Sequence, residues 1–230
     1  MKILKILEPL LLIFFLFLLV FTALKGVEQT ALFSVLFIVL SMVPFFLRFE
    51  HSRPKPRDIV PIVVMSLIAS LGRLAFTFLP GFQPVTAIVI ITGIVFGPQS
   101  GFMAGALTAF TSNMFMGQGP WTPWQMLGWA ITGYLAGQLI KSRIFRKKIS
   151  IYIFGALISI IYGWFLNIWV VIGFVKPITW QAVASTYALS IYVDILHAVS
   201  TVVFLVLTLG PWQRKLSRIK IKFGLMDPKA

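Results

Sequence analysis

The sequence predicts an all-α integral membrane protein, and three observations lead to this fold class. Of the 230 residues, 59% are hydrophobic and only 11% are charged, with a mean hydropathy of +0.95. Soluble domains carry roughly 25% charged residues, so this chain has too few to cover a water-facing surface. Several apolar segments approach the ~20 residues that a helix needs to cross a bilayer. The basic residues fall almost wholly between these segments.

The chain divides into two N-terminal transmembrane helices within residues 1–50 and a block of six helices at 58–222. The polar stretch RFEHSRPKPR separates the two parts. The expected spans are 8–25, 29–47, 58–79, 84–97, 100–116, 123–140, 150–174 and 183–209. The fourth and fifth are short and only GPQSG separates them, which predicts a tight hairpin or a broken pair. The first apolar run is long and lacks a clear cleavage site, which favours a retained helix over a signal peptide.

The spans differ in polarity along the chain. The first two carry almost no polar residues, which predicts lipid-facing helices outside the block of six, with a kink at Pro44 in the second. The third contains the small residues Ser66 and Ser70, which could face a partner. The fifth and sixth carry small residues at four-residue spacing, a pattern that permits close helix packing. These small residues are Gly101, Gly105, Ala109, Gly133 and Gly137.

Basic residues assign the two sides of the membrane. Four basic clusters fall on one side of a chain with eight spans: Lys2 and Lys5, Arg48 to Arg57, Lys141 to Lys148, and Arg214 to Lys222. The positive-inside rule makes that side cytoplasmic. The sequence therefore predicts a multi-pass protein of the cell membrane with both termini in the cytoplasm. The net charge of +14 then reflects orientation and contact with anionic lipid rather than binding to nucleic acid.

The chain lacks the motifs of common enzyme and metal sites. It has no cysteine, which excludes disulfides, thiolate metal sites and a cysteine nucleophile. It contains no HExxH, GxSxG or paired-aspartate motif and no glycine-rich phosphate loop. We therefore expect a protein that is not an enzyme and that uses no cofactor or metal. A carrier of this size would need a coupling ion or an external ATPase.

Two charged residues lie well inside the expected spans. Asp194 is the one acid of six that is far from a span end, and Arg73 is the one arginine inside a span. A charge in hydrocarbon costs several kcal/mol, so both should face the protein interior and have a partner. An Arg73–Asp194 ion pair is the natural expectation, with His197 one helical turn from the acid. Such a pair either fastens the third span to the eighth or contacts a substrate.

Asn113 and Asn167 are expected one to two turns below the outer surface. Their amides would lack hydrogen-bond partners in lipid, so both should face inward. They either hydrogen-bond between helices or form the floor of an outward-facing pocket.

Three tryptophans lie in expected outer loops beside amides and prolines. Trp121 and Trp124 occur in GQGPWTPWQM, between the fifth and sixth spans, and Trp180 follows the seventh. Flat rings beside glutamines suit a planar heteroaromatic or conjugated ligand, and prolines lower the cost of ordering a loop. Anchoring at the membrane interface is the alternative role of these rings.

Several stretches resemble the S components of energy-coupling factor (ECF) vitamin transporters. These are ASLGRLAFTFLPGFQPVTAIVIITGIVFGP, the loop GQGPWTPWQM and the DILHA of the last span, and the resemblance covers about residues 58–222. It implies an S-component-like core of six helices, preceded here by two extra transmembrane helices. It also implies an outward vitamin pocket beneath loops 80–83, 117–123 and 175–182. The implied partners are a transmembrane coupling protein and two cytosolic ATPase subunits.

The resemblance and the polar residues together define an expected substrate site. Its residues are Gln83, Asn113, Gln118, Trp121, Trp124, Gln125, Asn167, Trp180, Arg73, Asp194 and His197. S components dock through small residues of the first core helix, for which Ser66 and Ser70 are the nearest match. The resemblance is closest to the cobalamin type, so cobalamin is the expected vitamin, with folate, queuosine precursors and pantothenate as alternatives. For a carboxylate substrate, the counter-ion would be Arg73 or Lys176.

Two other classes of function stay open on the sequence alone. A self-sufficient ion-coupled carrier would use Asp194 and His197 and would need no ATPase. A membrane scaffold protein would bind no small ligand in a saturable way.

Overall fold

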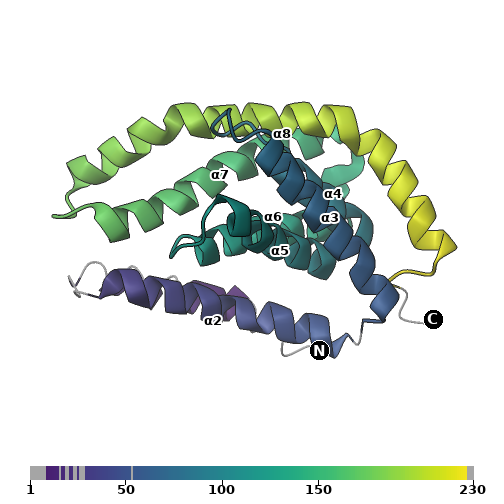
Figure 1. Cartoon of the computed structure of the whole chain (residues 1–230), viewed down its shortest axis with the longest axis horizontal. Helices are drawn as coiled ribbons and strands as arrows, with labels where there is room; N and C mark the ends of the chain where they lie inside the picture. Colours follow the sequence, from purple (N-terminus) through teal and green to yellow (C-terminus); the bar gives the residue numbers. More distant parts are fainter. Residues whose placement is uncertain are drawn as a thin grey trace.

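The computed structural model describes residues 9–15, 17–18, 21–22, 25, 29–52 and 54–226. Within these ranges the regular structure is helical, as the sequence predicts, and no strand occurs (Figure 1). The helices are α2 (Thr30–His51), α3 (Pro56–Ala75), α4 (Val85–Phe96), α5 (Pro98–Met116), α6 (Thr122–Leu139), α7 (Lys148–Phe174) and α8 (Trp180–Lys222), with a 3-10 turn η1 (Arg143–Arg146). The expected span at 8–25 is described only in part, and the basic residues Lys2, Lys5 and Arg53 lie outside the described residues.

Four of the described helices, α2, α3, α7 and α8, are long and apolar enough to cross a membrane. Helix α4 is apolar but shorter, at 12 residues. The apolar composition and these spans make the chain a multi-pass membrane protein.

Helix α4 lies at the centre of the six-helix block. All of its residues are buried, and it packs against α3, α5, α6, α7 and α8. Its sequence, VTAIVIITGIVF, is apolar on every side, as an enclosed helix requires. Gly97 ends the helix with φ at +99°, a conformation that favours glycine, and Pro98 begins α5 at once. The tight hairpin expected at GPQSG is confirmed.

Glycines bring α5 and α6 into backbone contact. A methyl group on Gly101 would meet the carbonyl of Gly133, and one on Gly133 would meet the carbonyl of Gly101. Gly105 faces the backbone of Trp129 in the same way. The small-residue stripes therefore have the close-packing role that their spacing predicts.

Helix α2 is packed on the block, so the prediction of a purely lipid-facing second helix is wrong. Ile38, Met42 and Phe45 are at most 3% exposed, and the Phe45 ring stacks on that of Phe102 in α5, 4.4 Å between centres. The opposite face of α2 is exposed and equally apolar. Because both faces have the same hydrophobic character, the sequence could not indicate which one meets protein and which one meets lipid.

Helix α8 has 43 residues and extends well beyond the expected span at 183–209. It continues through Pro211 and bends around the end of the block towards the start of α3 (Figure 1). The tail is held in place because Leu216 and Leu225 pack on the main core, and the Lys220 Nζ donates to the Val95 carbonyl at 2.8 Å. Proline interrupts one helical hydrogen bond, but this packing retains the helix on both sides of it.

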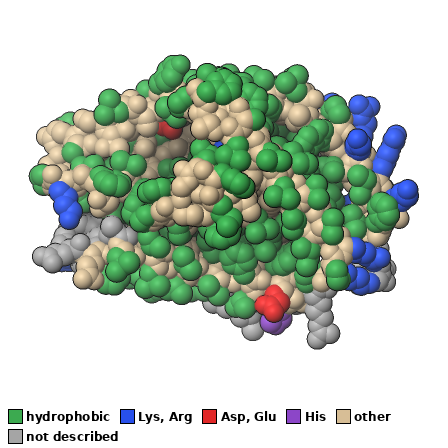
Figure 2. Space-filling model, in the orientation of Figure 1, with side chains coloured by type: hydrophobic (Ala, Val, Ile, Leu, Met, Phe, Trp, Pro, Cys, Tyr) green, Lys and Arg blue, Asp and Glu red, His purple; other side chains and the backbone are tan. Residues whose placement is uncertain are grey.

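One end of the molecule is strongly basic. Figure 2 shows Lys and Arg gathered on its right, where Figure 1 places the tail of α8 and the start of α3. Asp58 joins these two segments, because its carboxylate accepts the backbone N–H groups of Lys55 at 3.0 Å and Met226 at 2.8 Å. The sequence predicts that this basic end faces the cytoplasm, and we call the opposite end the outer end.

Candidate functional site

Arg73, in the last turn of α3, is the centre of a polar cluster in the outer half of the block. Its Nη1 donates to the Ser112 Oγ at 2.6 Å and to the Asn113 Oδ1 at 2.7 Å, both on α5. Its guanidinium lies 5.0 Å from the ring centre of Trp129 on α6, which is a cation–π contact. Within the described part of the chain, no carboxylate pairs with Arg73. The side chain is only half-buried.

Asn113 connects this arginine to the loop between α5 and α6. It is 1% exposed, and its Nδ2 donates to the Gln125 Oε1 at 2.7 Å and the Thr122 Oγ1 at 3.0 Å. The Thr122 hydroxyl in turn donates to the Gln118 Oε1 at 2.9 Å. The amides of GQGPWTPWQM therefore hold the loop and the polar cluster in one network. Asn113 faces inward, as the sequence predicts.

A stack of rings lies next to the guanidinium. Tyr162 of α7 stacks on Trp129 with centres 4.9 Å apart and planes 14° apart, and His197 of α8 meets Tyr162 edge-on at 5.4 Å. The Thr86 hydroxyl of α4 accepts the Trp129 Nε1–H at 3.2 Å and contacts the His197 Nε2 at 2.9 Å. Arg73 of α3, Thr86 of α4 and Tyr162 of α7 thus all contact Trp129 of α6. The Trp129 ring lies directly beneath the Arg73 guanidinium.

The sequence alone missed Trp129, Tyr162, Thr86 and Ser112. Trp129 lies in the second turn of α6 rather than in a loop, a position where a tryptophan has no interfacial anchoring role. In the sequence, the one signal that distinguishes Trp129 from the loop tryptophans is its position well inside the expected span 123–140.

Asp194 belongs to a separate network between α7 and α8. Its Oδ2 accepts the Ser190 hydroxyl at 2.9 Å, and Asn167 Nδ2 donates to the same Ser190 Oγ at 2.6 Å. The carboxylate, which belongs to a residue 6% exposed, lies against Gly163, where any Cβ would collide with it. The expected Arg73–Asp194 ion pair is therefore not formed, because Arg73 reaches α5 and α6 while Asp194 faces α7. Asp194 and His197 also have different partners.

Trp124 does not form part of an outer gate. It is fully buried and packs on Phe165 and Trp169, with ring centres 5.0 and 6.3 Å away. Trp124 lies in the first turn of α6, and its ring points towards α7 and away from the loop. By contrast, Trp121 and Trp180 are exposed. Gln83, another expected site residue, exchanges two hydrogen bonds between its backbone and the Ser200 hydroxyl.

We predict that Trp124→Ala lowers the stability of the detergent-purified protein by about 3–5 kcal/mol, the usual cost of emptying a large aromatic core site. Thermal unfolding of the detergent-purified variants measures the loss. Trp180→Ala, at a residue that is 76% exposed, should leave stability unchanged. Equal stability of the two variants would contradict the core position of Trp124.

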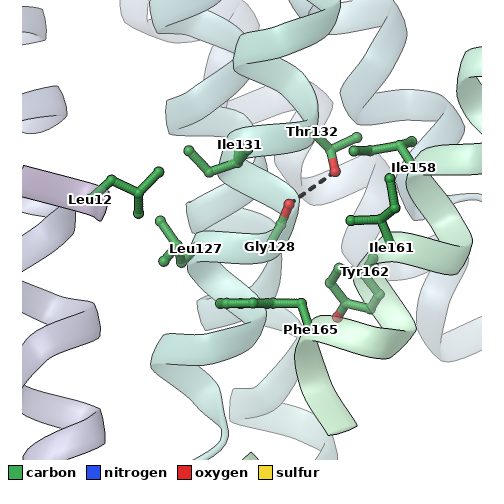
Figure 3. Close-up of a pocket in the computed structure, with 9 residues that line it drawn as sticks. All are labelled: Leu12, Leu127, Gly128, Ile131, Thr132, Ile158, Ile161, Tyr162 and Phe165. Carbon is green, nitrogen blue, oxygen red and sulfur yellow. Dashed lines mark hydrogen bonds between the residues drawn. The ribbon is translucent and has the colours of Figure 1, made fainter. Parts of the chain in front are cut away.

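An apolar cavity of about 150 Å³ lies beside this site, between α6 and α7 (Figure 3). Leu127, Gly128 and Ile131 line it from α6, Tyr162 and Phe165 from α7. Leu12, in the described part of the N-terminal segment, closes one side. Within the described residues, the buried Tyr162 hydroxyl has no hydrogen-bond partner, and neither does the buried Trp124 Nε1. The α6–α7 contact therefore holds two unused donors.

Ser66 and Ser70, predicted to dock a partner, are buried against α5. Their hydroxyls are within 3.2 and 3.3 Å of the carbonyls of Ala104 and Thr108, besides bonding to their own helix. Because both serines are buried, they form no surface on which a partner could dock, and the structure corrects this prediction. In an apolar setting, a serine satisfies its hydroxyl against a neighbouring backbone. The exposed face of α3 is instead aliphatic, with Val60, Val64 and Leu67.

Among the described residues, no group of three His, Asp or Glu side chains lies close enough to hold a metal ion. The site consists of one cation, amides, hydroxyls and stacked rings. Such an arrangement can bind a neutral or anionic planar solute by hydrogen bonds and stacking.

Comparison with known proteins gives a family and several distant relatives. The family model described as ECF-type riboflavin transporter, S component, matches residues 55–211. A UPF0397 protein of Aliivibrio fischeri strain MJ11 is 27% identical over 104 residues, which are 40% of this chain and 56% of that protein. A UPF0397 protein of Aliivibrio salmonicida is 29% identical over 104 residues, with the same shares.

A third relative, from Vibrio atlanticus, is 27% identical over 96 residues, covering 38% of this chain and 52% of that protein. The chain spans about half the length of the curated relatives it matches. No solved structure matches it. The family match covers more than half of the chain, from the start of α3 to Pro211 in α8, and includes the whole Arg73 cluster. The chain therefore belongs to the ECF-type riboflavin transporter S component family.

Proposed function

We propose that this chain is the vitamin-binding subunit of an ECF-type importer and that its substrate is a planar heteroaromatic vitamin, with riboflavin as the first compound to test. The observation that carries the proposal is Arg73, a half-buried guanidinium stacked on Trp129 with no carboxylate partner in the described residues. By default, an ionisable residue that lies inside a membrane protein and forms no ion pair marks a functional site.

The chemistry of the cluster matches such a ligand. Arg73 uses one of its three nitrogens for the hydrogen bonds to Ser112 and Asn113, which leaves donors for ring carbonyls of a vitamin. A flavin ring carries both carbonyls and an N–H on one edge. In the separate α7–α8 network, Asp194 is bonded to one hydroxyl and offers a carboxylate that accepts N–H groups.

Cobalamin, the vitamin expected from the sequence, becomes the second compound in the test. That expectation relied on the sequence resemblance, and Trp124, one of the expected site residues, is in the core. The family description names riboflavin instead. Folate, pantothenate and queuosine precursors follow, and for the two that carry a carboxylate, folate and pantothenate, Arg73 and the exposed Lys176 are the available cations.

Delivery to the cytoplasm would require the partners that ECF transporters use, a transmembrane coupling protein and two ATPase subunits. The alternative of an ion-coupled carrier has less support, because Asp194 and His197 do not share a hydrogen-bond network. Uptake in cells should therefore depend on co-expression of the ATPase module and should survive a protonophore.

The deciding experiment is calorimetric titration of the detergent-purified chain with each vitamin. We expect one compound, riboflavin first, to bind with a Kd below ~1 µM, equivalent to more than ~8 kcal/mol of binding free energy. Saturable binding of cobalamin alone would assign the cobalamin specificity instead. If no vitamin binds, the scaffold alternative replaces the proposal, and a scaffold would show no saturable isotherm for any of them.

A further inference from the structure

A groove at the basic end of the molecule is separate from the vitamin site. Its volume is about 450 Å³, within the ~300–1,000 Å³ of typical small-molecule sites. Val60 and Val64 of α3 form one wall, and Leu216, Ile219 and Phe223 of the α8 tail form the other. The groove exists only because α8 continues past Pro211 and turns back along α3 (Figure 1).

Two cations lie at one end of this apolar groove. Arg57 is part of its lining, and the Arg57 Nη2 is 3.8 Å from the position of a Cβ on Gly224. The Lys222 Nζ is 5.4 Å from the centre of the Phe223 ring. Because Phe223 and Gly224 are consecutive, both positive charges flank the same turn. Both side chains are exposed, so a ligand can reach them.

Asp58, which follows Arg57 in α3, forms no ion pair with either cation. Asp58 is the one acidic residue in α3 and in the described α8 tail, residues 210–226. Its two oxygens accept the backbone N–H groups of Lys55 and Met226, and the side chain is 8% exposed. Arg57 and Lys222 are thus a pair of positive charges at one end of the aliphatic groove. The groove lies on the end of the molecule where Lys and Arg gather (Figure 2).

We propose that the groove binds one anionic phospholipid, with an acyl chain between α3 and the α8 tail and the phosphate on Arg57 and Lys222. Basic pockets between transmembrane helices at the cytoplasmic side bind such headgroups, and aliphatic walls exclude the charged segments of soluble partners. A free phosphate would use the cations alone and gain nothing from Val60, Val64 and Ile219. The site is independent of which vitamin the outer cluster binds.

The test is native mass spectrometry of the full detergent-purified chain, incubated with equal amounts of phosphatidylglycerol and phosphatidylcholine that carry the same acyl chains. Each cation near an anionic headgroup changes affinity about fivefold, so the wild type should prefer phosphatidylglycerol by roughly 25-fold. Arg57→Gln with Lys222→Gln should remove this preference. Val64→Trp should reduce retention of both lipids, because it fills the aliphatic slot.

The matched control is Arg214→Gln with Lys215→Gln, which removes two exposed cations from the same tail but none from the groove. It should keep the preference. Equal loss in both double variants would mean a diffuse charge effect and would overturn the site. Displacement of the lipid by glycerol 3-phosphate would reassign it to a soluble phosphate. If Val64→Trp leaves lipid retention unchanged but blocks ATPase-dependent uptake, the groove is a protein-docking surface instead.

Discussion

Replacing Arg73 by glutamine should weaken riboflavin binding by roughly 10- to 150-fold. A hydrogen bond to a charged group contributes ~1.5–3 kcal/mol, and each 1.4 kcal/mol is a factor of ten in Kd. The variant also loses the cation–π contact that now fixes the guanidinium over Trp129. Calorimetric titration of the purified variants measures the effect, alongside thermal unfolding to show that each variant is folded.

Arg73→Lys separates the two contributions of this residue. An ammonium keeps the charge but cannot hydrogen-bond to Ser112 and Asn113 in the planar geometry of a guanidinium, so most of the loss should remain. The control is Arg48→Gln, which removes an arginine that bonds to the Tyr134 hydroxyl near the basic end. Riboflavin affinity that is unchanged in Arg73→Gln, or lost equally in Arg48→Gln, would remove Arg73 from the site.

Gly133→Ala should prevent recovery of the folded six-helix block. The new methyl group would meet the Gly101 carbonyl on α5 and the Val89 side chain on α4. Overpacking a core usually costs about 1–3 kcal/mol, and the cost is higher here because a backbone carbonyl cannot rotate away as a side chain does. Relieving the contact requires α5 and α6 to separate along their shared length. The measurement is the yield of monodisperse protein and its unfolding temperature.

The matched substitution is Gly173→Ala, in the last turn of α7. There the nearest atom to the new methyl group belongs to the Trp169 side chain at 3.5 Å, an ordinary contact distance. This variant should fold normally and gain a little helix propensity. Equal yields and unfolding temperatures for the two variants would show that α5 and α6 are not in backbone contact at Gly133.

Residue spacing and side-chain type were sufficient to predict most of the helices but few of their contacts. At GPQSG the sequence left a tight hairpin or a broken pair open, and the structure has the hairpin, with Gly97 ending α4 and Pro98 beginning α5. The small-residue stripes indicated close packing, because residues with little or no side chain let the backbones of two membrane helices approach each other. By contrast, α2 is apolar on both faces, and its burial against Phe102 depends on which helices the block presents to it.

The candidate site shows the same division. Asn113 was predicted to face inward because a lone amide is too costly in lipid, and the structure places it there with three polar neighbours. The choice of Asp194 as the partner of Arg73 was wrong. Both charges need polar neighbours, but Ser112 and Asn113 of α5 supply them for Arg73, and Ser190 on the same helix supplies one for Asp194. Sequence separation does not indicate which helices lie in reach.

Composition and residue spacing were enough to predict a membrane protein, most of its helices, the basic end and the inward polar residues, because apolar length and the cost of buried polar groups are local properties. The packing of the helices was needed to show that Trp124 is core, that Trp129 lies under Arg73, and that the α8 tail makes a groove with α3. These depend on which helix faces meet. In an apolar chain many faces are equally hydrophobic, so shape and a few hydrogen bonds select among them.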